Sequence, residues 1–194
     1  MRKIYIILTH TGTVLSNIIK TYTKDEYSHV SIALDEELEE MYSFGRLRPY
    51  NAFVAGFVHE KINEGTFKRF KKTKAMIFSM MVEDEQYDKI KNKIQEMEKE
   101  KETYKFNIWG LFAVSIHKKV EAPKTFYCAE FVKYILEESG IKVELPEIIR
   151  PENFKSIPNK KEIYKGLLRN YKNKTHKQYL KELIESCSRK EGII

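Results

Sequence analysis

The sequence predicts a single α+β domain in which an antiparallel sheet packs on helices. Apolar runs of strand length dominate the first 82 residues, and patterns with helical spacing follow from residue 83 onward. Strands that come before the helices, instead of alternating with them, are typical of α+β proteins. A length of 194 residues gives room for one domain, and 42% hydrophobic against 32% charged residues excludes general disorder.

The first strands are predicted by apolar runs and by alternation. Residues 4–8 form an isoleucine-rich run that predicts a buried strand, and apolar side chains at helical spacing predict a short helix over residues 14–19. Residues 29–34 alternate between large apolar side chains and smaller or polar ones, as a strand does. Residues 35–39 then form a turn, and residues 40–44 are predicted to be the returning strand of a hairpin.

The middle of the chain is predicted to end the sheet and begin the helices. We expect residues 45–56 to be irregular, because they contain a proline and an asparagine. Residues 57–70 are predicted to hold another strand pair about an Asn-Glu-Gly loop. The apolar run at residues 75–82 predicts a central strand, and residues 83–101 predict an amphipathic helix with an acidic start.

The last third of the chain is predicted to be mainly helical. The aromatic stretch at residues 104–116 predicts a buried helix. Residues 125–139 have inward-facing apolar side chains at helical spacing, followed by a glycine that ends the helix. After two prolines, residues 162–188 predict a basic helical tail.

Most of the net charge lies at the C-terminal end. The chain has 35 Lys and Arg against 28 Asp and Glu, or +7, and residues 159–194 hold ten basic and four acidic residues, or +6. We therefore divide the chain into a domain over residues 1–150 and a basic, mostly helical C-terminal extension over residues 151–194. Such a tail, like the shorter basic run at residues 68–74, can make weak contacts with nucleic acid or an anionic membrane. The alternative is a solvated surface.

Several classes of protein are excluded by what the sequence lacks. Two cysteines, Cys128 and Cys187, are too few for a disulfide scaffold or a thiolate zinc site, and there is no glycine-rich phosphate loop. We expect neither a cofactor nor a metal. No run reaches the roughly 18 apolar residues of a membrane span, and the apolar start is too short for a signal peptide. A cytoplasmic protein with no transmembrane segment is expected.

The chemistry-bearing candidates are a cysteine and a histidine. Cys128 lies in the first turn of a predicted helix, where free N–H groups and the positive helix end favour a thiolate nucleophile. His29 begins a predicted strand, from which an imidazole can reach a neighbouring helix end and take the thiol proton. The alternatives are an inert buried cysteine and a structural histidine.

Two segments together resemble a known family. Residues 28–32 read Ser-His-Val-Ser-Ile, and residues 126–132 read Phe-Tyr-Cys-Ala-Glu-Phe-Val. This order is similar to that of the circularly permuted NlpC/P60 proteins of the YiiX/YycO-like branch, relatives of the lecithin:retinol acyltransferase-like proteins. The resemblance covers about residues 1–145. It implies a papain-like fold with Cys128 as the nucleophile and His29 as the base.

The third group of the implied site does not map directly. In the resembled family, a polar residue on the returning strand orients the histidine. Pairing Asp35 with Glu40 across the turn places the apolar Phe44 at this position. A one-residue bulge brings in Ser43 instead, so Ser43 is the third catalytic candidate, while Tyr42 and Glu40 lie nearer the turn. A triad, a dyad and a protein that has lost catalysis all stay open.

The implied reaction is acyl transfer through a thioester on Cys128, with His29 as general base and then general acid. The backbone N–H of Cys128 is the oxyanion donor, assisted by His10 or Tyr127 in the cleft. This predicts a cysteine peptidase or amidase acting on a small amide, peptide or lipid substrate. Two alternatives stay open: a non-catalytic binding module of the same fold whose basic tail contacts nucleic acid or an anionic membrane, and a lipid-directed acyltransferase or phospholipase.

Overall fold

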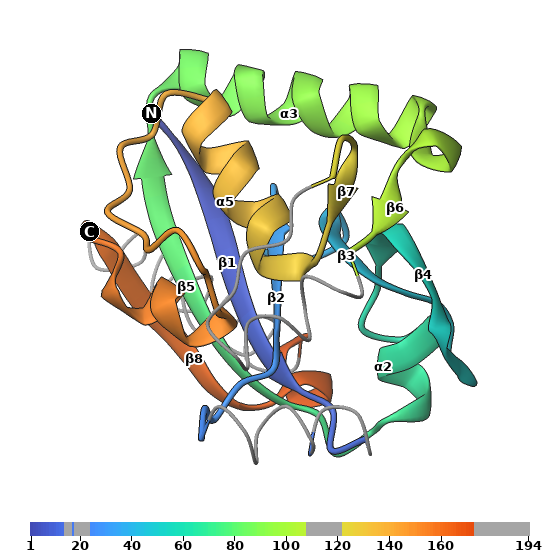
Figure 1. The fold of residues 1–194 in the computed structure, drawn as a ribbon. Coiled ribbons are helices and arrows are strands. Elements are labelled where there is room, and N and C mark those ends of the chain that lie inside the picture. The colour runs from blue at the N-terminus through green and yellow to red at the C-terminus, as the bar shows by residue number, and fades with distance from the viewer. Residues whose placement is uncertain (14–16, 18–23, 108–121, 173–194) are drawn as a thin grey trace, which may run out of the picture.

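A six-stranded antiparallel sheet with helices on its faces forms the body of the protein. The computed structural model describes residues 1–13, 17, 24–107 and 122–172. The strands run in the order β4-β3-β2-β1-β5-β8, and α5 lies across the sheet with α3 beside it (Figure 1). The elements are β1 (Arg2–His10), β2 (His29–Ala33), β3 (Met41–Arg48), β4 (Asn51–Glu60), α2 (Gly65–Arg69), β5 (Lys74–Val82), α3 (Asp84–Lys99), η1 (Lys101–Thr103), β6 (Lys105–Phe106), β7 (Thr125–Phe126), α5 (Cys128–Glu138), η2 (Pro151–Ser156), β8 (Lys160–Leu167) and η3 (Leu168–Asn170).

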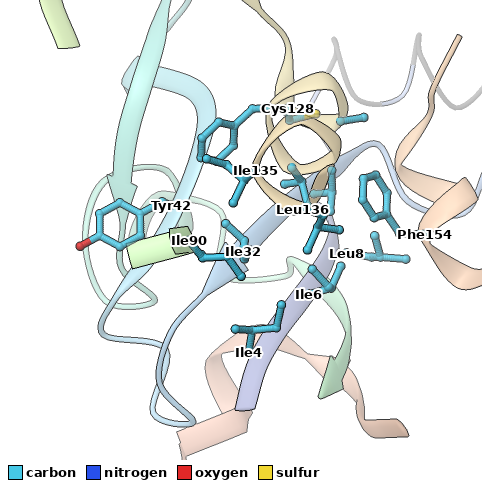
Figure 2. Close-up of a cluster of buried hydrophobic side chains, with 14 of the residues drawn as sticks. Ile4, Ile6, Leu8, Ile32, Tyr42, Ile90, Cys128, Ile135, Leu136 and Phe154 are labelled. Carbon is cyan, nitrogen blue, oxygen red and sulfur yellow. The ribbon is translucent and has the colours of Figure 1, made fainter. Parts of the chain in front are cut away.

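Both faces of the sheet are covered, which explains why its central strands are continuous apolar runs. Side chains alternate along a strand, so Ile4, Ile6 and Leu8 of β1 point to one face. They pack there against α5, as Figure 2 shows. Tyr5 and Ile7 belong to a second cluster on the other face. A strand buried on both sides needs no polar positions, as the sequence of β1 shows.

The predicted strands at the start of the chain are confirmed, and the predictions that follow need correction. β1, β2, β3 and β5 lie where the apolar patterns place them. The expectation of irregular structure over residues 45–56 is wrong, because β3 continues to Arg48 and β4 begins at Asn51. The predicted strand pair over residues 57–70 is also wrong. The end of β4 is followed there by α2, whose Phe67 is buried in the second cluster.

The amphipathic helix predicted over residues 83–101 is confirmed as α3, with Ile90, Ile94 and Met97 buried. The helix predicted from residue 125 is confirmed as α5, although it begins only at Cys128. The predicted helix over residues 14–19 and most of that over residues 104–116 lie outside the described residues.

The C-terminal extension is built differently from the prediction. Residues predicted to start a helix at 162 form β8, which pairs with β5 at the edge of the sheet. Tertiary pairing with β5 overrides the helical pattern, and a lysine-rich sequence is typical of an edge strand. Phe154 and Ile157, just before β8, are buried in the same core as α5. Cys187 and the rest of the predicted helical tail lie outside the described residues.

No helix within the described ranges has both the length and the apolar character needed to cross a membrane. This agrees with the sequence, which has no apolar run of that length.

Removal of the Phe154 ring tests whether the C-terminal segment is part of the core. Phe154 is fully buried, so Phe154→Ala is expected to lower the free energy of unfolding by about 3–5 kcal/mol. Urea denaturation measures this, with Tyr50→Ala as the control because Tyr50 is exposed. Equal effects from the two substitutions would mean that residues 151–157 are a loose appendage.

Candidate active site

The helix α5 places Cys128 at its first position. The short strand β7 leads into the helix, and Tyr127 is its N-cap residue. The carboxylate of Glu130 accepts hydrogen bonds from the Tyr127 backbone N–H at 3.0 Å and from the Asn107 side chain at 3.3 Å. The N–H groups of Cys128 and Ala129 have no acceptor within the helix, because the first turn of an α-helix never supplies one. The Cys128 residue itself is only 4% exposed.

A carboxylate holds the imidazole of His29. His29 is the first residue of β2, and Glu60 is the last residue of β4. The Nε2 atom of His29 lies 3.0 Å from Oε1 of Glu60, and the two side chains are 18% and 9% exposed. The hydroxyl of Ser31 donates to the other carboxylate oxygen at 2.5 Å. Both oxygens of Glu60 are therefore engaged, and the imidazole is fixed in one orientation.

The balance of charge keeps His29 protonated. Burial by itself lowers the pKa of His29, but the charge of Glu60 and hydrogen bonds to Cys128 and Glu60 outweigh it and raise the pKa from 6.5 to about 10. The imidazole therefore interacts with both the Cys128 side chain and the Glu60 carboxylate, and it lies 3.0 Å from the carboxylate. Because Nε2 faces Glu60, Nδ1 is the nitrogen left for the sulfur. A thiol, an imidazole and a carboxylate in this order form the arrangement of a nucleophile, a base and an orienting group.

The strands β2 and β3 make room for this contact. Their register includes only the pairs Ile32–Tyr42 and Ala33–Met41, so the ladder does not continue to the His29 end of β2. Ser43, the expected third catalytic residue, lies at this opening. Its hydroxyl donates to the backbone oxygen of Val30 at 2.7 Å. This bond takes the place of a backbone N–H donor from the neighbouring strand. The structure thus places Glu60, and not Ser43, against the imidazole.

A glycine lies where the imidazole and the carboxylate meet. If the register of the Ile32–Tyr42 and Ala33–Met41 pairs is extended along the strands, Gly45 lies opposite His29. This register differs by one residue from the one that the predicted turn pairing implies. A Cβ atom on Gly45 would lie 3.3 Å from Cε1 of His29 and 3.4 Å from Oε1 of Glu60. The absence of a side chain at residue 45 therefore lets groups from β2 and β4 meet across β3.

The two predicted oxyanion helpers lie in different settings. The hydroxyl of Tyr127 donates to the backbone oxygen of Ile149 at 2.8 Å. Burial raises the pKa of this phenol, and the charges of Glu130 and Cys128 raise it further. Its single proton is therefore committed to the loop. His10 ends β1, and its Nδ1 lies 3.4 Å from the hydroxyl of Ser28, the residue before His29. His10 is thus at the same end of the sheet as His29.

Glu60 is the site residue that sequence reasoning missed. The resembled family pattern directs attention to the strand after the histidine, whereas Glu60 lies one strand further along. A signal was present, because Glu60 is the only acidic residue between positions 40 and 64. A single carboxylate at the end of an otherwise uncharged strand indicates a specific partner, since carboxylates are rarely buried unless they are paired.

A groove runs along the outer face of α5. Its volume is about 490 Å³, and it is lined by Ala122, Pro123, Thr125, Phe126, Glu130, Lys133, Tyr134, Glu137, Glu147 and Ile149. Cys128 is not among the lining residues, because it lies on the buried face of α5 with Phe131 and Val132. The groove therefore adjoins the helix that holds the thiol without containing the thiol.

Comparisons with models of known protein families, with curated proteins and with solved structures give no match for this chain. Within the described residues, no group of three or more His, Cys, Asp or Glu side chains is arranged to hold a metal ion. The function is therefore argued from the geometry of Cys128, His29 and Glu60.

The His29–Glu60 pair predicts a definite dependence of stability on pH. The pKa of His29 is raised in the folded state, so its stabilisation is complete below pH 6.5 and is lost as the pH rises through about 10. Glu60→Gln should therefore lower the free energy of unfolding more at pH 6 than at pH 10. We expect the loss at pH 6 to be larger by roughly 1–3 kcal/mol. Urea denaturation across this range, with the exposed Glu64→Gln as control, measures it. A difference that does not change with pH would contradict the proposed pairing.

The Gly45 position predicts a second effect on His29. Gly45→Ala adds a Cβ against both the imidazole and the carboxylate, so it should separate them and lower the pKa of His29 from its raised value. Titration of the His29 ring by NMR measures this. Gly56→Ala is the matched control, because its Cβ would meet only the Leu47 side chain, at 3.4 Å. An unchanged His29 pKa in Gly45→Ala would show that the contact tolerates a side chain.

Proposed function

We propose that this protein is a cysteine hydrolase that cleaves amide or ester bonds through a thioester intermediate on Cys128. The observation that supports this most is the imidazole of His29, which contacts Cys128 and is held by a buried carboxylate. The nucleophile also begins a helix, whose free N–H groups can stabilise a developing oxyanion. Each group therefore has the partner that its role requires.

The reaction begins with the imidazole of His29 already protonated and the sulfur of Cys128 beside it as a thiolate. The thiolate attacks the substrate carbonyl carbon, and the N–H groups of Cys128 and Ala129 stabilise the negative oxygen. The tetrahedral intermediate collapses as the bond to the leaving group breaks, and His29 gives its proton to that group. Water then attacks the thioester and gives one proton to the now neutral His29. Collapse of this second intermediate releases the acid and restores the thiolate beside the protonated imidazole.

Glu60 has the role of a positioning residue in this sequence. Its charge stabilises the protonated imidazole of His29, and its hydrogen bond to Nε2 directs Nδ1 toward the sulfur. Ser31 in turn holds the carboxylate. Loss of such a group slows the reaction without abolishing it, because the nucleophile and base are retained.

The arrangement also supports the papain-like fold of the permuted NlpC/P60 type as the finer description. A histidine at the start of a central strand precedes a cysteine at the start of a helix that packs on the same sheet. The departure from that family pattern is the orienting group, which lies on β4 instead of β3. Such a site suits an amide, peptide or lipid ester substrate.

The runner-up is a non-catalytic module of the same fold. The observation in its favour is the 4% exposure of Cys128, since a buried thiol can be inert. Reactivity of the thiol separates the two proposals directly.

Alkylation by iodoacetamide tests the site in the natural protein and in a Cys187→Ser background. We expect Cys128 to react below pH 7, and His29→Ala to slow this reaction at least about tenfold at pH 6.5. Glu60→Gln should slow turnover of a hydrolysed substrate by roughly 10²- to 10⁴-fold. Mass spectrometry identifies the modified residue, and Cys128→Ser serves as the unreactive control.

Two outcomes would count against catalysis. Reaction of Cys128 only near pH 8.5 in all variants would mean that His29 does not activate the sulfur. A folded protein whose Cys128 stays unmodified at every pH would favour the binding module.

A further inference from the structure

Two stretches of the chain contain no acidic residue. Residues 41–59 and residues 65–82 lack Asp and Glu altogether, yet together they contain seven Lys and Arg. The first stretch forms β3 and most of β4, and the second forms α2 and β5. A near-neutral domain with such stretches must concentrate positive charge wherever they come together.

The fold brings the two stretches together at the turn of the β3–β4 hairpin. The guanidinium of Arg69, the last residue of α2, lies 4.0 Å from the ring centre of Tyr50 in the hairpin turn. Arg46 and Arg69 both approach the ring of Phe70, at 5.7 and 5.4 Å. Burial, and then the nearby charge of Arg69, lower the pKa of Arg46. These contacts join α2 to the hairpin turn. We call the exposed side chains of the turn, of the end of α2 and of the residues just after it the basic hairpin surface: Leu47, Arg48, Tyr50, Lys68, Arg69, Lys71 and Lys72.

The cations of this surface have no acidic partner in the part of the chain that the structure describes. Arg48, Lys68, Arg69, Lys71 and Lys72 are exposed and form none of the ion pairs found there. Some cations elsewhere in the described residues are paired with carboxylates. Arg2, for example, contacts both Asp84 and Asp88, and Lys124 contacts Glu100 at 2.8 Å. Among the described residues, no ion pair therefore compensates the positive charge of the basic hairpin surface.

The tip of the same hairpin presents apolar side chains to solvent. Tyr50 is 83% exposed and Leu47 is 51% exposed. Few other large hydrophobic residues in the described part of the chain are exposed. Tyr50 lies against the guanidinium of Arg69, and Arg48 follows Leu47 at the end of β3. An exposed apolar tip beside positive charge matches the interface of an anionic bilayer, where apolar side chains enter the headgroup region and Lys or Arg contact phosphates.

We propose that the basic hairpin surface docks the protein on an anionic lipid bilayer. A bilayer fits better than nucleic acid, because Arg69 covers one face of the Tyr50 ring and Leu47 offers no surface for base stacking. Gly45 precedes Leu47 by two residues on β3, so Leu47 lies roughly 7 Å along the strand from Gly45, the residue beside the His29 imidazole. Docking thus brings the site close to lipid, but it does not depend on catalysis at that site.

Co-sedimentation with vesicles tests this proposal. The full chain is mixed with vesicles of phosphatidylcholine alone or with added phosphatidylglycerol, and binding is expected only to the mixed vesicles and to weaken with salt. The triple variant Lys68→Gln, Lys71→Gln, Lys72→Gln should bind about 100-fold more weakly. Leu47→Ser with Tyr50→Ser should lower affinity about tenfold. Thermal unfolding checks that the variants stay folded.

The matched control removes three other exposed lysines at the end of α3 and beyond: Lys99→Gln, Lys101→Gln, Lys105→Gln. This control should bind anionic vesicles like the natural protein. Equal loss in both triple variants would reduce the effect to net charge and overturn the proposal. The proposal would also be overturned if only the triple variant Lys174→Gln, Lys177→Gln, Lys181→Gln lost vesicle binding. That result would assign binding to the basic tail. Tight binding to duplex DNA or RNA with none to vesicles would assign the surface to nucleic acid.

Discussion

The hydrogen bond between His29 and Glu60 is the contact on which the geometry of the site depends. Each group is costly to bury alone, and each offsets the cost for the other when the imidazole is protonated. The contact joins β2 to β4 across β3, so three features must agree: the strands part beyond the Ile32–Tyr42 pair, residue 45 is glycine, and Ser31 holds the second carboxylate oxygen. A change in any of them alters how the imidazole meets the sulfur.

The other half of the site is held by the core instead of by charge. The buried face of α5 packs on β1 and β2, and Tyr127 anchors the helix start to the loop at Ile149. Glu130 closes the first turn by accepting the Tyr127 N–H. These contacts fix the position of Cys128 independently of the His29–Glu60 pair. The proposed catalytic geometry therefore arises where a packed helix end meets an opening in the sheet.

The sequence predicts the parts of this arrangement that follow from local pattern. The strand that begins at His29 and the helix that begins at Cys128 are both evident from periodicity and end signals. Glu60 could not be assigned in the same way, because its role depends on β4 lying beyond β3 and on a register one residue from the expected one. The edge strand β8 was missed for a similar reason. Its conformation is set by the free edge of β5, which a local pattern does not encode.

The strand β3 connects the two functional regions that we propose. Its Gly45 gives the imidazole room, and two residues later Leu47 reaches solvent as part of the basic hairpin surface. Net charge did not point to this region, since acids elsewhere balance its lysines and arginines in any sum over the chain. Only the packing of α2 beside the hairpin shows that the positive charge is local. Because field strength at a surface depends on nearby charges within about a Debye length, this local excess, and not the overall +7, governs which anionic partner the hairpin meets.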